Sequence, residues 1–138
     1  MVKQSNISIL VSALISLEVI KDGVLLETID LTTKPYYIFG RNKETCDVIF
    51  ENPSVSRVHM VLQHKDTGDL FLYDLESTHG TFLNRAAIPP RKYTPLHVGD
   101  FFKVGQSAKN YILNGPEHRE SKVVYLIRML RVFNHLRL

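Results

Sequence analysis

Short apolar runs rich in β-branched and aromatic residues recur along most of the chain, separated by turn residues. Such runs, bounded by Gly, Pro, Asn and Asp, are typical of strands. They lie at 17–21, 24–31, 36–39, 48–50, 59–64, 70–75, 81–83, 98–104 and 111–113. This pattern predicts an all-β fold, a sandwich of two sheets with about 10–11 short strands.

Two Asp/Gly pairs fall between apolar positions and predict tight turns. Asp22-Gly23 separates the first two runs, and both central positions of the favoured two-residue hairpin turn need positive φ. Gly99-Asp100 lies between Val98 and Phe101, so we expect a second tight hairpin there.

The period of the pattern changes after Pro116. Apolar residues then recur at helical spacing, at Val123, Leu126, Ile127, Leu130 and Phe133. With Arg128 and Arg131 on the other side, they predict a short C-terminal amphipathic helix from about Ser121 to about Leu136. Three roles stay open for it: docking on the sandwich or a second copy, binding a partner's groove, or lying on an anionic membrane.

The N-terminal residues 1–15 form a separate extension. Its apolar part, 7–15, is too short to span a bilayer. The stretch before Val11-Ser12-Ala13 is also shorter than the roughly seven to fifteen apolar residues of a secretory signal. We therefore expect no transmembrane segment and no leader. The chain divides into this extension, a domain at 16–116 and a basic helical tail at 117–138.

The positive charge of the chain belongs to the tail. Of 17 Lys and Arg and 14 Asp and Glu, five bases and two acids follow Pro116, so the rest holds 12 of each. A nucleic-acid binder places its basic excess on the folded domain, where it displaces counterions. Nucleic acid is therefore not expected at the domain, although the tail leaves such a role open.

Cys46 is the only cysteine of the sequence, so it forms no internal disulfide. It falls in a predicted loop beside Asp47, and it suits a reducing compartment. We expect a small space-filling residue rather than a redox group.

Three polar clusters lie on connectors between the predicted strands, at 39–41, 53–59 and 77–84. They carry hydroxyl and backbone N–H donors, and Arg41 and Arg57 add guanidinium groups. Loops that converge at one end of a sandwich would gather these donors into a nest for a doubly charged anion. A phosphate monoester has such a charge and three strong acceptor oxygens.

In order and spacing, these clusters resemble the forkhead-associated (FHA) domain, a reader of phosphothreonine. The resemblance rests on Gly40-Arg41, Ser56-x-x-His59, Ser77-Thr78-x-Gly80-Thr81 and Asn84. The longer strings 54–59 and 74–84, with Ile88-Pro89-Pro90-Arg91, are most similar to the FHA domain of kanadaptin-type proteins. The resemblance covers about residues 16–116 and implies a two-sheet FHA-type sandwich.

Two residues fit the phosphate itself. Arg41 directly follows a predicted strand, and its planar guanidinium can meet two phosphate oxygens at once. Ser56 offers a hydroxyl beside backbone N–H groups. The resemblance implies that both contact the phosphate. The alternatives are a surface Arg41 paired with Asp47 or Glu44, and a Ser56 that caps a turn.

The resemblance also implies supporting roles. Thr78 and Asn84 would hold the main chain of the phosphopeptide, and Arg57 would support the peptide or the phosphate. His79 replaces an Asn common in the family, which leaves the peptide-clamping role of that position open. The residues expected to shape the loops are Gly40, His59 and Gly80.

Two other site classes fit poorly. Ser56, His59 and Asp74 contain the residue types of a catalytic triad, but no Gly-x-Ser-x-Gly motif accompanies them. His59, His64, His79 and Cys46 lack the spacing of a zinc site. We therefore expect no enzyme, no metal, no cofactor and no small-molecule substrate.

The sequence thus predicts a module that binds a phosphothreonine-containing protein and gathers it into an assembly. That assembly is expected in the nucleus, alone or together with the cytoplasm. The alternative is a phosphate-independent interaction scaffold, associated with RNA processing.

Overall fold

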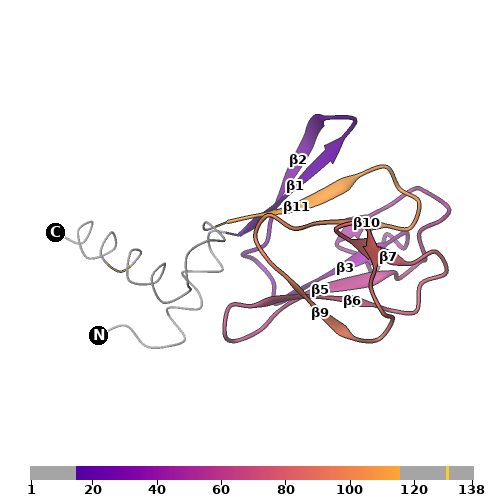
Figure 1. The fold of residues 1–138 in the computed structure, drawn as a ribbon. Coiled ribbons are helices and arrows are strands. Elements are labelled where there is room, and N and C mark those ends of the chain that lie inside the picture. The colour runs from indigo at the N-terminus through magenta and orange to yellow at the C-terminus, as the bar shows by residue number, and fades with distance from the viewer. Residues whose placement is uncertain (1–14, 116–129, 131–138) are drawn as a thin grey trace.

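The fold consists of two antiparallel-rich sheets packed face to face (Figure 1). The computed structural model describes residues 15–115 and residue 130. Its strands are β1 (Ser16–Lys21), β2 (Val24–Asp30), β3 (Tyr36–Gly40), β4 (Val48–Ile49), β5 (Met60–His64), β6 (Leu70–Asp74), β7 (Thr81–Leu83), β8 (Ala86–Ala87), β9 (Tyr93–Leu96), β10 (Phe101–Val104) and β11 (Asn110–Asn114). The six-stranded sheet has the order β2-β1-β11-β10-β7-β8, and the five-stranded sheet has the order β4-β3-β5-β6-β9. The predicted all-β sandwich is confirmed.

Alternation of side chains explains how the two sheets share one core. In β1, Leu17 and Val19 are buried while their neighbours face outward, and β6 and β11 show the same period of two. The centre is aromatic: the Phe39 ring lies 5.6 Å from the rings of Phe102 and Tyr111, both on the opposite sheet. These edge-to-face contacts join the sheets beneath the connecting loops.

The first predicted hairpin is confirmed and the second is wrong. Asp22 and Gly23 have φ of 51° and 74°, as the turn between β1 and β2 requires. Gly99-Asp100, by contrast, lies on a connection between sheets, because β9 pairs with β6 and β10 pairs with β7 and β11. The Gly99 N–H donates to the Leu113 carbonyl, which fixes this corner on β11. A turn signal alone does not say whether the chain stays in the same sheet.

Strands β8 and β9 were not predicted. β8 contains only two alanines, and it follows a turn in which Asn84 and Arg85 both have positive φ without any glycine. β9 contains Pro95, which a central strand would exclude but an edge strand tolerates.

Both predicted end segments fall beyond the described ranges. Apart from residue 130, the expected C-terminal helix lies outside the residues that the structure describes, and so do residues 1–14 of the N-terminal extension. Ile15 is buried, and its carbonyl accepts a hydrogen bond from the Leu31 N–H. Within 15–115, no helix is long and apolar enough to cross a membrane.

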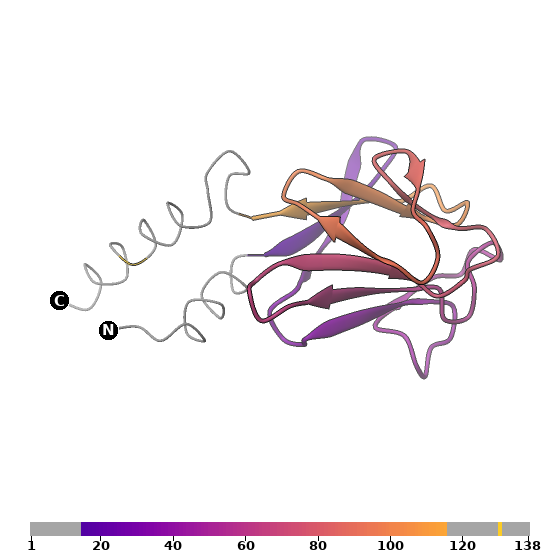
Figure 2. The same cartoon turned by 60° about the horizontal axis from the view of Figure 1, so that its bottom comes forward.

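Connectors from both sheets meet at one end of the sandwich, on the right in Figures 1 and 2. They follow β3, precede β5 and precede β7. The three sequence clusters lie on these connectors, so the topology brings them to the same end of the molecule.

Phe39 offers a direct test of the aromatic core. Phe39→Ala should lower the free energy of unfolding by about 3–5 kcal/mol, because it empties a fully buried site between the sheets. Tyr36→Ala on the same strand is the matched control: Tyr36 is 49% exposed, and its loss should cost under about 0.5 kcal/mol. Urea denaturation monitored by circular dichroism measures both, and equal losses would contradict this core assignment.

Candidate functional site

Backbone hydrogen bonds hold the end of β3 against the segment that precedes β5. The Arg41 N–H donates to the Ser56 carbonyl at 3.2 Å, and the Asn42 N–H donates to the Arg57 carbonyl at 3.0 Å. The His59 N–H donates back to Phe39 at 2.8 Å. Arg41 and Ser56, which are distant in sequence, are therefore neighbours in the fold.

Gly40 is required here by close packing rather than by its φ. A Cβ at this position would lie 2.3 Å from the Arg57 carbonyl oxygen and 2.8 Å from Cys46 Sγ. Any side chain would push the segment 54–58 away from Arg41. Gly80 differs, since its φ of 82° is the left-handed conformation that favours glycine, whereas an added Cβ would make only ordinary contact with the Phe82 ring.

His59 joins the second and third clusters. Its buried ring accepts a hydrogen bond at Nδ1 from the Ser56 N–H, 3.0 Å away, and contacts the Gly80 carbonyl at Nε2, 2.8 Å away. A backbone N–H can only donate and a carbonyl can only accept, so the ring is the neutral Nε2–H tautomer. These two contacts join the connector that carries Ser56 to the one that carries Gly80.

Asp74 is a buried residue that organises the third cluster, and the sequence analysis assigned it no such role. Its Oδ1 accepts hydrogen bonds from the Ser77 hydroxyl at 2.6 Å and the Thr81 hydroxyl at 2.7 Å, and its Oδ2 accepts from the Ser77 N–H. The Ser77 hydroxyl in turn accepts from the Gly80 N–H at 3.0 Å. The signal was present in the sequence as an acid three residues before a serine, the spacing of a local side-chain turn.

Ser56 and Thr78 meet across the gap between their connectors. The Thr78 N–H donates to the Ser56 hydroxyl oxygen at 3.2 Å. The proton of that hydroxyl is then available to another acceptor. Arg41, Ser56 and Thr78 therefore form one continuous group of donors, which we call the loop cluster.

Arg41 is exposed but anchored. Its Nε–H donates to the Val55 carbonyl, which fixes the guanidinium beside Ser56. None of the ion pairs between described residues includes Arg41, so the alternative of a pair with Asp47 or Glu44 is not seen. Asp47 instead pairs with Lys34 and accepts from the Ile38 N–H.

Arg57 and His79 lie at the edge of this group. Both side chains are exposed, on the segments that hold Ser56 and Thr78 respectively. In the chain, Arg57 directly follows Ser56 and His79 directly follows Thr78. Neither side chain forms an ion pair within the described residues.

Asn84 is not part of the loop cluster. It lies in the turn between β7 and β8, where its Nδ2 donates to Asp100 at 3.0 Å and its Oδ1 accepts from the Phe101 N–H at 3.1 Å. Its amide holds the start of β10, so its contacts do not support the expected grip on a peptide. The sequence does not reveal this role of Asn84, because only the pairing of the strands shows that Asn84 lies next to Phe101.

The residue types of a catalytic triad are not arranged as one. Nδ1 of His59 faces the N–H of Ser56 instead of its hydroxyl, and Nε2 lies 3.8 Å from Asp74 Oδ1. The serine oxygen therefore has no base to activate it.

The geometry also argues against a metal site and against a redox role for the cysteine. Among residues 15–115, no three His, Cys, Asp or Glu side chains cluster as metal ligands. Cys46 is buried and donates to the Arg57 carbonyl at 3.2 Å, and burial raises the pKa of its thiol. Its expected space-filling role agrees with this position.

With the geometry established, comparison with known proteins identifies similar chains. A model described as FHA domain matches residues 37–105. Human kanadaptin is 45% identical over 127 residues, which is 84% of this chain and 17% of kanadaptin. The human nuclear inhibitor of protein phosphatase 1 is 40% identical over 98 residues, 70% of this chain and 28% of that protein. The chain thus spans less than a third of each of these relatives.

Solved structures agree with the sequence matches. The MEK1 FHA domain superposes with a TM-score of 0.68 at 27% identity, covering 75% of this chain and 90% of that one. The resemblance inferred from the sequence clusters is confirmed.

The buried His59 makes the stability of the fold depend on pH. Burial lowers the pKa of its ring, because the charged form is poorly solvated and would turn a second N–H toward Ser56. In the unfolded chain the pKa is about 6.5. As pH falls below that value, His59 binds a proton in the unfolded state but stays neutral in the folded state. The free energy of unfolding therefore decreases. Burial also lowers the pKa of His64, which adds to the effect.

Urea denaturation between pH 7.5 and 5.5 tests this dependence. His59→Gln should lower stability at pH 7.5 and flatten the loss of stability toward pH 5.5, because one of the two titrating groups is removed. His97→Gln, whose side chain is 75% exposed, is the matched control and should leave the stability at pH 7.5 unchanged. A His59→Gln slope equal to that of the wild type would show that His59 does not titrate with folding.

Proposed function

This chain belongs to the forkhead-associated domain family of phosphopeptide-binding interaction modules, and on that premise we propose that it binds a phosphothreonine-containing segment of another protein at the loop cluster. The FHA domain is a binding module rather than a catalyst, so the expectation of no enzymatic activity is confirmed for this domain. The chemistry of the site is recognition of a charged group.

The guanidinium of Arg41, which forms no ion pair within residues 15–115, is the observation that carries the proposal. It is anchored through Nε to the Val55 carbonyl, and two acids on connectors at the same end of the sandwich pair with other cations. Asp47 pairs with Lys34, and Glu76 pairs with Arg91 at 2.9 Å. A phosphate would supply the missing anion and accept charge-assisted hydrogen bonds, which are about twice as strong as neutral ones.

In this proposal Arg41 and Ser56 hold the phosphate, and Thr78 holds the peptide main chain. Arg57 and His79 flank them and contact the peptide on either side. Asn84 is left out, because its amide already binds Asp100 and Phe101. Gly40, His59 and Gly80 keep the connectors in place through the contacts described above.

Phosphothreonine is proposed over phosphoserine for two physical reasons. A buried γ-methyl group contributes roughly 0.8 kcal/mol, about a fourfold preference. The β-branched side chain also loses less rotamer freedom on binding.

We place the complex in the nucleus, as part of an assembly that a protein kinase controls. The support is similarity: one relative is named a nuclear inhibitor of protein phosphatase 1, and it shares 40% identity across this domain. A module with micromolar affinity, about −8 kcal/mol, suits reversible recruitment of a modified partner.

Substitution of Arg41 tests the proposal. Arg41→Ala should weaken binding of peptides from an oriented phosphothreonine library by about 2 kcal/mol or more, roughly 30-fold, because it removes a charge-assisted hydrogen bond to the phosphate. Isothermal titration of the wild type with the selected peptide and with its unphosphorylated and phosphoserine forms gives the dependence on phosphate and on the methyl group.

The matched control is Arg85→Ala, which removes an exposed arginine outside the loop cluster and should leave the affinity unchanged. Thermal melts establish that both variants are folded. Equal binding with and without phosphate, or no binding at all, would overturn the proposal and favour a phosphate-independent scaffold.

A further inference from the structure

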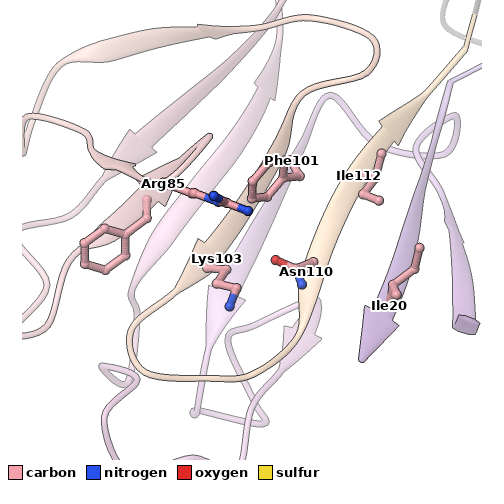
Figure 3. Close-up of a pocket in the computed structure, with 7 residues that line it drawn as sticks. Ile20, Arg85, Phe101, Lys103, Asn110 and Ile112 are labelled. Carbon is pink, nitrogen blue, oxygen red and sulfur yellow. The ribbon is translucent and has the colours of Figure 1, made fainter. Parts of the chain in front are cut away.

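A second surface of the molecule lies on the outer face of the six-stranded sheet. A groove of about 550 Å³ opens there, lined by Ile20, Phe82, Arg85, Phe101, Lys103, Asn110 and Ile112 (Figure 3). We call it the sheet groove. None of its lining residues belongs to the loop cluster.

The register explains why these residues share a face. Ile20 pairs with Asn110 and Phe101 pairs with Ile112, so their side chains point to the same side of the sheet. Lys103 pairs with Phe82 on the next strand. All of them alternate with core residues such as Val19, Phe102 and Tyr111. The floor of the groove is thus largely apolar and built on four adjacent strands, β1, β11, β10 and β7.

The apolar floor continues onto the edge strand β2. Leu25 pairs with Ile20 and is 54% exposed, and its neighbours Val24 and Leu26 are also exposed. Large side chains that are left open at an edge strand favour contact with another chain. The groove therefore extends toward a free edge of the sheet.

Positive charge borders this apolar floor. Figure 3 shows Arg85 extended toward Phe101 and Lys103 beside Asn110. Neither cation takes part in an ion pair between described residues. The acids nearest in the register are Glu18, which accepts from Asn114, and Asp100, which accepts from Asn84 and His97. Both carboxylates accept hydrogen bonds from other residues, and within residues 15–115 neither forms an ion pair with Arg85 or Lys103.

An acceptor at the floor also lacks a donor. Oδ1 of Asn110 is buried, and within the described part of the chain no hydrogen bond satisfies it. A buried carbonyl oxygen without a donor costs about 1–3 kcal/mol. Because this oxygen is buried, an N–H group of an occupant would reach it only after the Asn110 side chain turns toward the groove.

From these observations we infer that the sheet groove docks an acidic amphipathic segment of a partner protein, with its apolar side chains on Phe101, Ile112 and Ile20 and its carboxylates on Arg85 and Lys103. The interaction is independent of phosphorylation and of the loop cluster. It gives the module a second contact, so that one chain can join two proteins or hold one partner at two points.

Charge argues against two other occupants of the groove, the C-terminal segment of this chain and a second copy of the domain. The segment after Pro116 carries five Lys and Arg against two Glu, so it would bring like charges to Arg85 and Lys103. A second copy of the groove would do the same, because a two-fold interface places each patch opposite itself. An acidic partner is the occupant whose charge complements the groove.

The test uses the full chain and a phage-displayed library of unphosphorylated random peptides, selected with a phosphothreonine peptide present in excess. The enriched peptides should be net acidic with aromatic or aliphatic residues. Their synthetic, fluorescein-labelled forms should bind the wild type in fluorescence anisotropy and bind Arg85→Glu/Lys103→Glu at least ten-fold more weakly. Binding should also weaken as salt is raised.

A control with the same change of charge is Lys65→Glu/Lys92→Glu, since Lys65 lies between β5 and β6, Lys92 directly precedes β9, and neither lines the groove. It should bind the peptides as the wild type does, and Arg41→Ala should do so as well. Failure to enrich acidic peptides, or equal affinity for both double variants, would overturn the inference. So would sedimentation showing a wild-type dimer that Arg85→Glu/Lys103→Glu dissolves, or tight binding of a synthetic 117–138 peptide to the groove.

Discussion

The hydrogen bonds of one buried neutral imidazole hold the functional end of this molecule together. The ring of His59 fastens the N–H of Ser56 and the carbonyl of Gly80, which belong to connectors leading to different sheets. The same Gly80 carbonyl accepts from the Gly105 N–H, so β10 is tied to the same point. Without this bridge the donors of the loop cluster would move independently, and a rigid nest for an anion would become three separate loops.

The surroundings of Arg41 show how a neutral domain can hold a site for an anion. Three acids at this end of the domain make internal contacts. Asp74 accepts hydrogen bonds from two hydroxyl groups, and Asp47 and Glu76 pair with Lys34 and Arg91. Overall charge is therefore a poor guide to what the surface attracts. Local pairing decides it, because the interaction between charges falls with distance and with exposure to salt. The same reasoning distinguishes Arg85 and Lys103 in the sheet groove.

The sequence was informative where a residue acts through its own local chemistry. Asp22-Gly23 specified its turn, and alternation along β1 and β6 specified which side chains are buried. It misled where the outcome depends on pairing between distant segments. Gly99-Asp100 has the local signature of a hairpin, yet it joins two sheets because β9 and β10 have different partners. Asn84 likewise takes its role from Phe101 across the ladder, and the sheet groove exists only once four strands are in register.

The pairing of the first and last strands has a consequence for how such a domain can be carried by a larger protein. Ser16 lies opposite Asn114, so the chain enters and leaves the sandwich through adjacent strands, at the end away from the connectors that bear Arg41 and Ser56 (Figure 1). A longer polypeptide could pass through this point almost without a gap in its path, with the sandwich attached as a side branch. The binding end would then project outward from the host, whatever lies on either side.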